Sequence, residues 1–193
     1  MQQRILAAAV ELTTEVGWAR VTMPAIAARI GVSRQTLYNE VGSKPRLAEL
    51  MIMQELQGFL AAVDAAFDAH QPDAVASIRA GTAAVMEVAQ HHPLLRAIVG
   101  AEHGAATELL PLLTSRGSGV QAAATEVLAS RLSECQLGEC REQLECRDQL
   151  AKIASVVVRL VLSNVTQPAG SASEVAEQVA WVADRLLAVQ PHG

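Results

Sequence analysis

Aromatic residues are scarce in this chain, at 3% of 193 residues. A pocket for flat aromatic compounds uses stacking rings, so the scarcity argues against that class of ligand. Only Phe59, Phe67 and Trp181 follow the first 50 residues. Hydrophobic residues still make up 51% of the chain, which is enough for a sizeable aliphatic core and argues against disorder.

Cysteine is also rare, and no apolar run is long. The cysteines number three, whereas a secreted disulfide framework normally uses an even number, so we expect free thiols in a reducing compartment. The longest dense apolar run, residues 153–162, contains Arg159 and is much shorter than the ~20 residues of a membrane span. The N-terminal stretch has no signal-peptide pattern. We expect a cytoplasmic protein without a membrane segment.

The chain has a net negative charge, but basic residues outnumber acidic residues in its N-terminal part. The formal net charge is −5, yet residues 1–50 carry six Lys or Arg against four Glu. A basic end on an acidic body is typical of a module that faces phosphates and is joined to a second function. No HExxH motif, phosphate loop or nucleophile–base pattern is present, so we expect neither an enzyme nor a cofactor.

Apolar residues recur at helical spacing throughout, and no stretch alternates with period two. The sequence therefore predicts an all-α protein of about nine helices. Three predicted N-caps, Thr22, Ser33 and Ser43, and a stop at Gly31 divide its first part into short helices. Later helices are predicted over about 74–90, 94–101, 148–164 and 175–189. A near-duplicated hexapeptide at 139–150 is too short for a solenoid repeat.

Two short helices joined by Gly31 and Val32 predict a helix-turn-helix unit. The exposed positions of its second helix carry groove-reading side chains: Arg suits guanine, Gln and Asn suit adenine, and Thr suits the thymine methyl group. Tyr38 and Lys44 are suited to phosphates. A polar, solvated helix in an ordinary bundle is the alternative.

The stretch ILAAAVELTTEVGWARVTMPAIAARIGVSRQTLYNEVGSK resembles the DNA-binding domain of the TetR family of bacterial repressors. The resemblance covers residues 4–51, and it departs at Val41, where the family often has an aromatic residue. It implies an all-α homodimer that binds double-stranded DNA and carries a small-molecule domain. The DNA-contacting residues it implies are Thr22, Ser33, Arg34, Gln35, Thr36, Tyr38, Asn39 and Lys44.

On this basis we expect a DNA-binding domain over 1–48 and a ligand-binding and dimerisation domain over 49–193. A dimer reads two half-sites, so the operator is expected to be palindromic. The last two helices are the predicted homodimer contact, because the helix over 148–164 is apolar on more than one face. Internal core packing is the alternative.

A small hydrophobic effector of aliphatic character is predicted, since the body has few stacking rings. The predicted wall residues are Met86, Ile98, Leu110, Leu113, Leu128, Val157 and Val161. For each of them, plain core packing is the alternative. Arg159 meets either a ligand carboxylate or, in the preferred interpretation, an acid or water.

Other functions remain open at this stage. His91 and His92 are adjacent on the chain and are interpreted as a helix end, so no metal site is predicted. Cys135, Cys140 and Cys146 allow a redox sensor, and a non-specific DNA binder or a small helical enzyme are further alternatives. The sequence does not distinguish a repressor from an activator.

Overall fold

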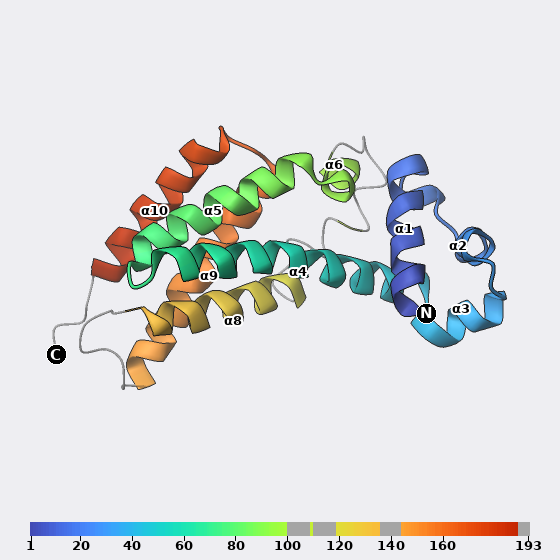
Figure 1. Ribbon diagram of the computed structural model, residues 1–193, viewed down its shortest axis with the longest axis horizontal. Coiled ribbons are helices and arrows are strands. Elements are labelled where there is room, and N and C mark those ends of the chain that lie inside the picture. Colours follow the sequence, from blue (N-terminus) through green and yellow to red (C-terminus); the bar gives the residue numbers. More distant parts are fainter. Residues whose placement is uncertain (100–108, 110–118, 136–143, 189–193) are drawn as a thin grey trace.

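The computed structural model describes residues 1–99, 109, 119–135 and 144–188, and this part of the chain is entirely helical (Figure 1). The prediction of an all-α fold is confirmed. The described residues form nine α-helices and one 3-10 turn. These are α1 (Gln2–Val16), η1 (Trp18–Arg20), α2 (Met23–Ile30), α3 (Arg34–Val41), α4 (Lys44–His70), α5 (Ala74–His91), α6 (Pro93–Val99), α8 (Gly119–Glu134), α9 (Leu144–Thr166) and α10 (Ala172–Ala188).

Local capping divides the N-terminal part as predicted. The Thr22 side chain accepts a hydrogen bond from Ala25 N at 3.3 Å, and the Ser33 side chain accepts one from Thr36 N at 3.0 Å. Gly31 has φ 70° and ψ 39°, a left-handed conformation that a residue with a side chain rarely adopts. It ends α2 and sets the turn into α3, which produces the helix-turn-helix.

Helices α1, α2 and α3 form a compact head around their own apolar side chains. Ile5, Ile26 and Leu37 are fully buried in it. Val41 is also buried, so an aliphatic side chain fills this core position without an aromatic ring. Arg4 donates from Nη2 to Ile30 O at 3.0 Å, which ties α1 to the carbonyl end of α2.

Helix α4 starts in the head and runs along the whole body (Figure 1). It crosses the expected boundary between residues 48 and 49 without a break. Helix α5 packs along α4, α10 packs on α5 and α9, and α8 lies against α4 and α9. The head is therefore joined to the body through a continuous helix rather than through a flexible linker.

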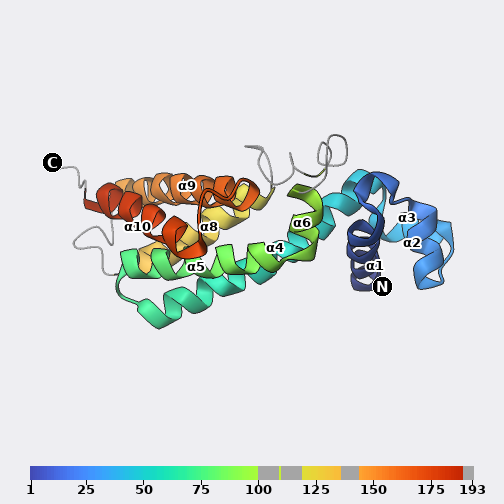
Figure 2. The same ribbon diagram turned by 90° about the horizontal axis from the view of Figure 1, so that it is seen from above.

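A second connection runs through α6, which packs against α1 of the head (Figure 2). Leu94 and Leu95 of α6 belong to the same buried cluster as Ile5 and Leu6 of α1. The cluster also includes Met51 of α4. The head and the near end of the body consequently share one core.

Within the described ranges, two helices are long and apolar enough to cross a membrane by length and composition alone, α4 and residues 147–166 of α9. The sequence expectation considered only uninterrupted apolar runs and missed them. Both helices pack in the bundle, where Leu56 and Phe67 of α4 and Ile153 and Val157 of α9 are buried. These buried side chains have partners within this protein, whereas other apolar side chains of the two helices, such as Val156, are exposed.

The predicted helix limits are least accurate around the duplicated hexapeptide. Helix α9 runs over Leu144–Thr166, so it includes the whole second copy, residues 145–150. Most of the first copy lies outside the described residues. At the far end of the body, Asp73 caps α5 by accepting from Ala76 N at 2.9 Å. This cap sets the start of α5 directly after the turn that follows α4.

Candidate DNA-binding surface and ligand cavity

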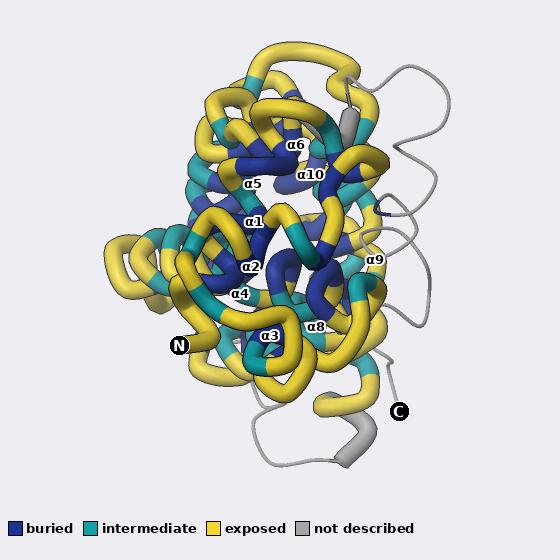
Figure 3. Tube along the Cα trace, turned by 90° about the vertical axis from the view of Figure 1, so that its right-hand side faces the viewer, coloured by how far each residue is buried: buried dark blue, intermediate teal, exposed yellow. Residues whose placement is uncertain are grey.

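Helix α3 lies at the end of the molecule, where it presents a polar face to solvent (Figure 3). Leu37 and Val41 are buried and anchor it. Arg34, Gln35 and Asn39 are exposed, and Tyr38 is 47% exposed. Because helical neighbours share a face at spacings of three and four residues, Arg34, Gln35 and Tyr38 project together from one end of the head.

Hydrogen bonds within α3 hold several of these side chains in place. Gln35 donates from Nε2 to Asn39 Oδ1 at 2.9 Å. The hydroxyls of Ser33 and Thr36 are 2.8 Å apart. In the described residues Arg34 takes part in no ion pair. Its guanidinium therefore remains available for an external acceptor.

Two further predicted DNA-contacting residues, Lys44 and Thr22, also hold helices of the head in place. Lys44 donates from Nζ to Trp18 O at 3.0 Å, and Nζ lies 4.8 Å from the centre of the Trp18 ring. This cation–π and hydrogen-bond contact fixes the start of α4 to η1. Thr22 is exposed and caps α2. A phosphate near Lys44 would meet a charge that is already positioned by the fold.

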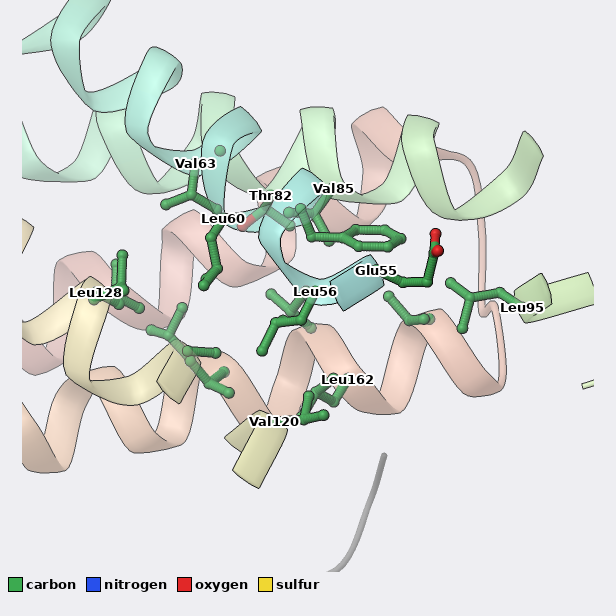
Figure 4. Close-up of a pocket in the computed structure, with 18 of the residues that line it drawn as sticks. Glu55, Leu56, Leu60, Val63, Thr82, Val85, Leu95, Val120, Leu128 and Leu162 are labelled. Atoms are coloured by element: carbon green, nitrogen blue, oxygen red, sulfur yellow. The ribbon is translucent and has the colours of Figure 1, made fainter. Parts of the chain in front are cut away.

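A cavity of about 130 Å³ lies in the body beside α4. Helices α4, α5, α6, α8 and α9 contribute its wall, together with His92 between α5 and α6 (Figure 4). The wall is almost entirely aliphatic. The described residues that line it are Ile52, Glu55, Leu56, Phe59, Leu60, Val63, Phe67, Ile78, Gly81, Thr82, Val85, His92, Leu94, Leu95, Val120, Ala124, Val127, Leu128, Val157, Val158, Val161, Leu162 and Val165.

Three of the seven predicted wall residues lie in this wall: Leu128, Val157 and Val161. Met86 is buried with Val175 and Val179 of α10, but it is not among the described residues that line the cavity. It follows Val85 by one residue, and a rotation of about 100° around α5 turns it away from the cavity. Placing Met86 in the wall was therefore wrong.

The other three predicted wall residues cannot be located in the cavity. Ile98 belongs to α6, and nothing is described of its side chain. Leu110 and Leu113 lie outside the described residues. Aliphatic side chains of α4 that are not among the predicted wall residues, such as Leu56 and Leu60, also line the cavity.

A polar pair lies at one end of this apolar cavity, and sequence reasoning missed it. Nε2 of His92 lies 2.9 Å from Oε2 of Glu55. Both side chains are mostly buried, and the His92 ring is tilted against Phe59 with centroids 5.4 Å apart. Interpreting His92 only as a helix-ending residue was therefore incomplete. A signal in the sequence was Glu55 itself, a charged residue on an otherwise apolar face of α4.

The alternative metal and redox functions gain no support from the described residues. His70 and His91 each bond through Nδ1 to a carbonyl one turn earlier, at 2.8 and 3.0 Å. No group of three possible metal ligands is found in the described ranges. Burial raises the pKa of the Cys135 thiol, and the nearby Glu134 carboxylate adds to this effect. Less thiolate is then available at neutral pH, so Cys135 is a poor nucleophile.

The outer faces of α9 and α10 expose apolar side chains. Val156 is 41% exposed and Trp181 is 62% exposed. Arg159 is also exposed on α9, away from the cavity wall. The guanidinium of Arg185 lies 5.6 Å from the Trp181 ring centre. Among the described residues, Val156 and Trp181 are thus the large apolar side chains that α9 and α10 leave exposed in the single chain.

Comparisons with known proteins agree with this geometry. Residues 5–51 match the family described as bacterial regulatory proteins, tetR family, and residues 73–185 match the family described as bacterial tetracyclin repressor, C-terminal domain. The chain is 25% identical over 181 residues to the HTH-type transcriptional regulator AlkX of Mycobacterium tuberculosis. This alignment covers 93% of the chain and 82% of the relative.

Solved structures show the same fold. The TetR family repressor AlkX from a Dietzia species, described as implicated in biodegradation of n-alkanes, has a TM-score of 0.75 and 25% identity; the match covers 97% of this chain and 96% of the relative. The Rhodococcus erythropolis transcriptional repressor QsdR has a TM-score of 0.66 and 18% identity, covering 100% and 96%. The second likeness concerns the fold alone.

Proposed function

Because this chain belongs to the TetR family of bacterial transcriptional regulators, we propose that it is a cytoplasmic repressor released from its operator by an aliphatic effector. It is a DNA-binding regulator and not an enzyme. The observation that carries the proposal is the aliphatic cavity beside α4, the helix that continues into the head. We divide the work between a DNA-binding unit at 1–48 and a ligand-binding and dimerisation unit at 49–193.

The DNA-reading roles are assigned to the exposed face of α3. Arg34 and Gln35 read base edges in the major groove, with Asn39 and the Thr36 methyl group as further base contacts. Four other residues are assigned to the phosphate backbone. These are Thr22, Ser33, Tyr38 and Lys44. Regulators of this family act as dimers on operator DNA, so two such faces read a palindromic site.

The outer face of α9 and α10 is proposed as the homodimer contact. An exposed Trp and an exposed Val on adjacent helices favour burial against a second copy. Arg159 lies on the same side of α9 as Val156, three residues later. It is proposed to meet an acid of the other copy or water at the edge of the contact, rather than a ligand.

The aliphatic effector is inferred from the wall of the cavity. Leu, Val and Ile side chains supply nearly all of it, and Phe59 and Phe67 are the aromatic residues in it. Burial of an alkyl chain gains about 25 cal/mol per Å² of apolar surface. The relative from Dietzia is described as implicated in biodegradation of n-alkanes, and this description is compatible with an aliphatic ligand.

The proposed mechanism uses both connections between body and head. The cavity touches α4 and α6, and α6 packs on α1. A ligand that separates α8 and α9 from α4 tilts α4 and shifts α6. The two recognition helices then lose the spacing of successive major grooves, about 34–36 Å. The effector must favour the tilted form by a few kcal/mol to release DNA.

Filling the cavity with protein atoms tests the effector. Ala124 lines the cavity on α8, while Ala122 is exposed two residues earlier. Ala124→Phe is expected to raise the concentration of octanol or octane needed for operator release at least ~10-fold, because a ring occupies the ligand volume. Ala122→Phe is the matched control and should behave as wild type. Equal responses of the two variants, measured by fluorescence anisotropy of operator DNA, would contradict the assignment.

Substitutions in the head separate base reading from phosphate binding. Arg34→Ala or Gln35→Ala is expected to reduce discrimination between operator and random DNA by about 1–3 kcal/mol. Lys44→Ala should weaken binding to all DNA alike and reduce the salt slope by about 1. Arg147→Ala, at the distant end of α9, is the control for loss of positive charge. The opposite pattern in competition titrations at fixed salt refutes these roles.

A charge on the outer face tests the dimer contact. Val156→Glu is expected to raise the dimer dissociation constant at least ~10-fold, because burying an unpaired carboxylate is costly. Val88→Glu is the matched control, since Val88 on α5 is 38% exposed and Val156 is 41% exposed. Sedimentation velocity over a concentration series measures both. A dimer that survives Val156→Glu but not Val88→Glu moves the contact to α5.

A further inference from the structure

Two polar side chains of the cavity wall, Glu55 and His92, lie at the end that faces the head, whereas Thr82 lies between the two ends. Figure 4 places Glu55 and Leu95 toward one end and Leu128 and Val63 toward the other. Leu95 belongs to α6, which packs on the head helix α1. His92, which precedes α6 directly, joins Glu55 at this end. The cavity is thus an aliphatic channel with one polar terminus.

The proton positions in this pair follow from its chemistry. An ionised carboxylate only accepts hydrogen bonds. Nε2 of His92 therefore carries a proton and donates to Oε2 of Glu55 over 2.9 Å. In the neutral imidazole, Nδ1 is then an acceptor. Nδ1 is buried and has no partner among the described residues.

The second carboxylate oxygen of Glu55 completes the terminus. Within the described part of the chain, the one hydrogen bond of Glu55 is the bond from His92 to Oε2. When the His92 ring carries a single proton, Oε1 of Glu55 and Nδ1 of His92 are the two open positions of the pair, and both are acceptors. A ligand that satisfies them must bring a hydrogen-bond donor.

We propose that the Glu55–His92 pair binds the terminal hydroxyl of an aliphatic alcohol, whose chain extends along α4 toward Leu128. The proposal rests on the aliphatic effector proposed above and names its polar end. The hydroxyl donates one hydrogen bond to the pair, and its alkyl chain covers the apolar wall. Because the pair bridges α4 and the start of α6, the bound hydroxyl contacts both connections to the head.

Other terminal groups match the pair less well. An alkane leaves Nδ1 without a partner, which is unfavourable in a buried site. A carboxylate has no donor and places a second negative charge beside Glu55. An ammonium group brings three donors to two acceptors, so at least one N–H stays unpaired in an apolar cavity. A hydroxyl brings a single donor.

Operator release by matched compounds tests the terminal group. The full-length dimer on fluorescent operator DNA is titrated with octanol, octane, octanoate and octylamine, and then with longer and shorter primary alcohols. Octanol is expected to act at about five- to tenfold lower free concentration than octane, as one buried hydrogen bond implies. Octanoate and octylamine are expected to act more weakly than octanol.

Two histidine variants attach the preference to one residue. His92→Phe keeps a ring but removes the acceptor, so the ratio of octane to octanol potency should fall to about one. His91→Phe is the matched control, because His91 is exposed and lies outside the cavity wall; its ratio should equal that of wild type. Melting temperatures identify any loss of fold. If His92→Phe does not fold, Glu55→Gln gives a second test. The Gln side chain brings an N–H donor where Glu55 offers only acceptors, so the preference for octanol over octane should fall.

The outcomes distinguish failure of the hydroxyl assignment from failure of the proposed aliphatic effector. Equal potency of octane and octanol in wild type leaves the aliphatic effector intact and overturns the hydroxyl assignment. Stronger release by octanoate or octylamine also overturns it. Operator binding that no aliphatic compound weakens defeats both proposals. A preference for octanol that is unchanged in His92→Phe moves the polar contact away from this pair and overturns the inference.

Discussion

The structure depends on a single helix being shared by two cores. Leu47 and Met51 of α4 are fully buried with the side chains of the head, and Leu56 and Leu60 of the same helix line the body cavity. Close-packed interiors do not deform freely, so a change of side-chain packing at one end of a rigid helix must be accommodated at the other. The cavity and the recognition helix α3 are therefore mechanically connected through α4.

The far end of α4, like the near end, is held by a positively charged side chain. Arg131 of α8 forms ion pairs with Asp68 of α4 and with Glu134, and its guanidinium lies 5.8 Å from the Phe67 ring centre. At the near end, Lys44 holds α4 to η1 through Trp18. The cavity lies between these two attachments. A ligand that moves α4 thus acts on a helix whose ends are fixed by different partners, and the softer attachment determines where the movement appears.

Structural features that are determined by neighbouring residues in the sequence could be predicted from it. The caps at Thr22, Ser33 and Ser43 and the stop at Gly31 were predictable, because a cap is decided by a few neighbouring residues. The helix-turn-helix followed from them. The exposed face of α3 was also predictable, since the apolar residues Leu37 and Val41 mark its inner side.

The cavity was predictable in its chemistry but only partly in its residues. The scarcity of aromatic side chains predicted an aliphatic wall. Which of the two neighbouring residues Val85 and Met86 lines the cavity, however, depends on the rotation of α5 about its axis. That rotation is set by packing against α4 and α10. The Glu55–His92 contact joins residues 37 positions apart, so no local pattern contained it. Trp181 was assigned to a dimer contact by its place in the final helix, and the exposure of its ring adds the physical reason.

The most direct test of the coupling is the distance between the two heads of the dimer. A spin label is placed at Glu40→Cys, an exposed position of α3 outside the proposed base contacts, in a chain whose three natural cysteines are replaced. Double electron–electron resonance then measures the label-to-label distance with and without a saturating aliphatic compound. The account predicts that the ligand shifts the distribution to a different mean distance. An unchanged distribution at ligand concentrations that release the operator would contradict the central claim that α4 transmits the state of the cavity to the recognition helices.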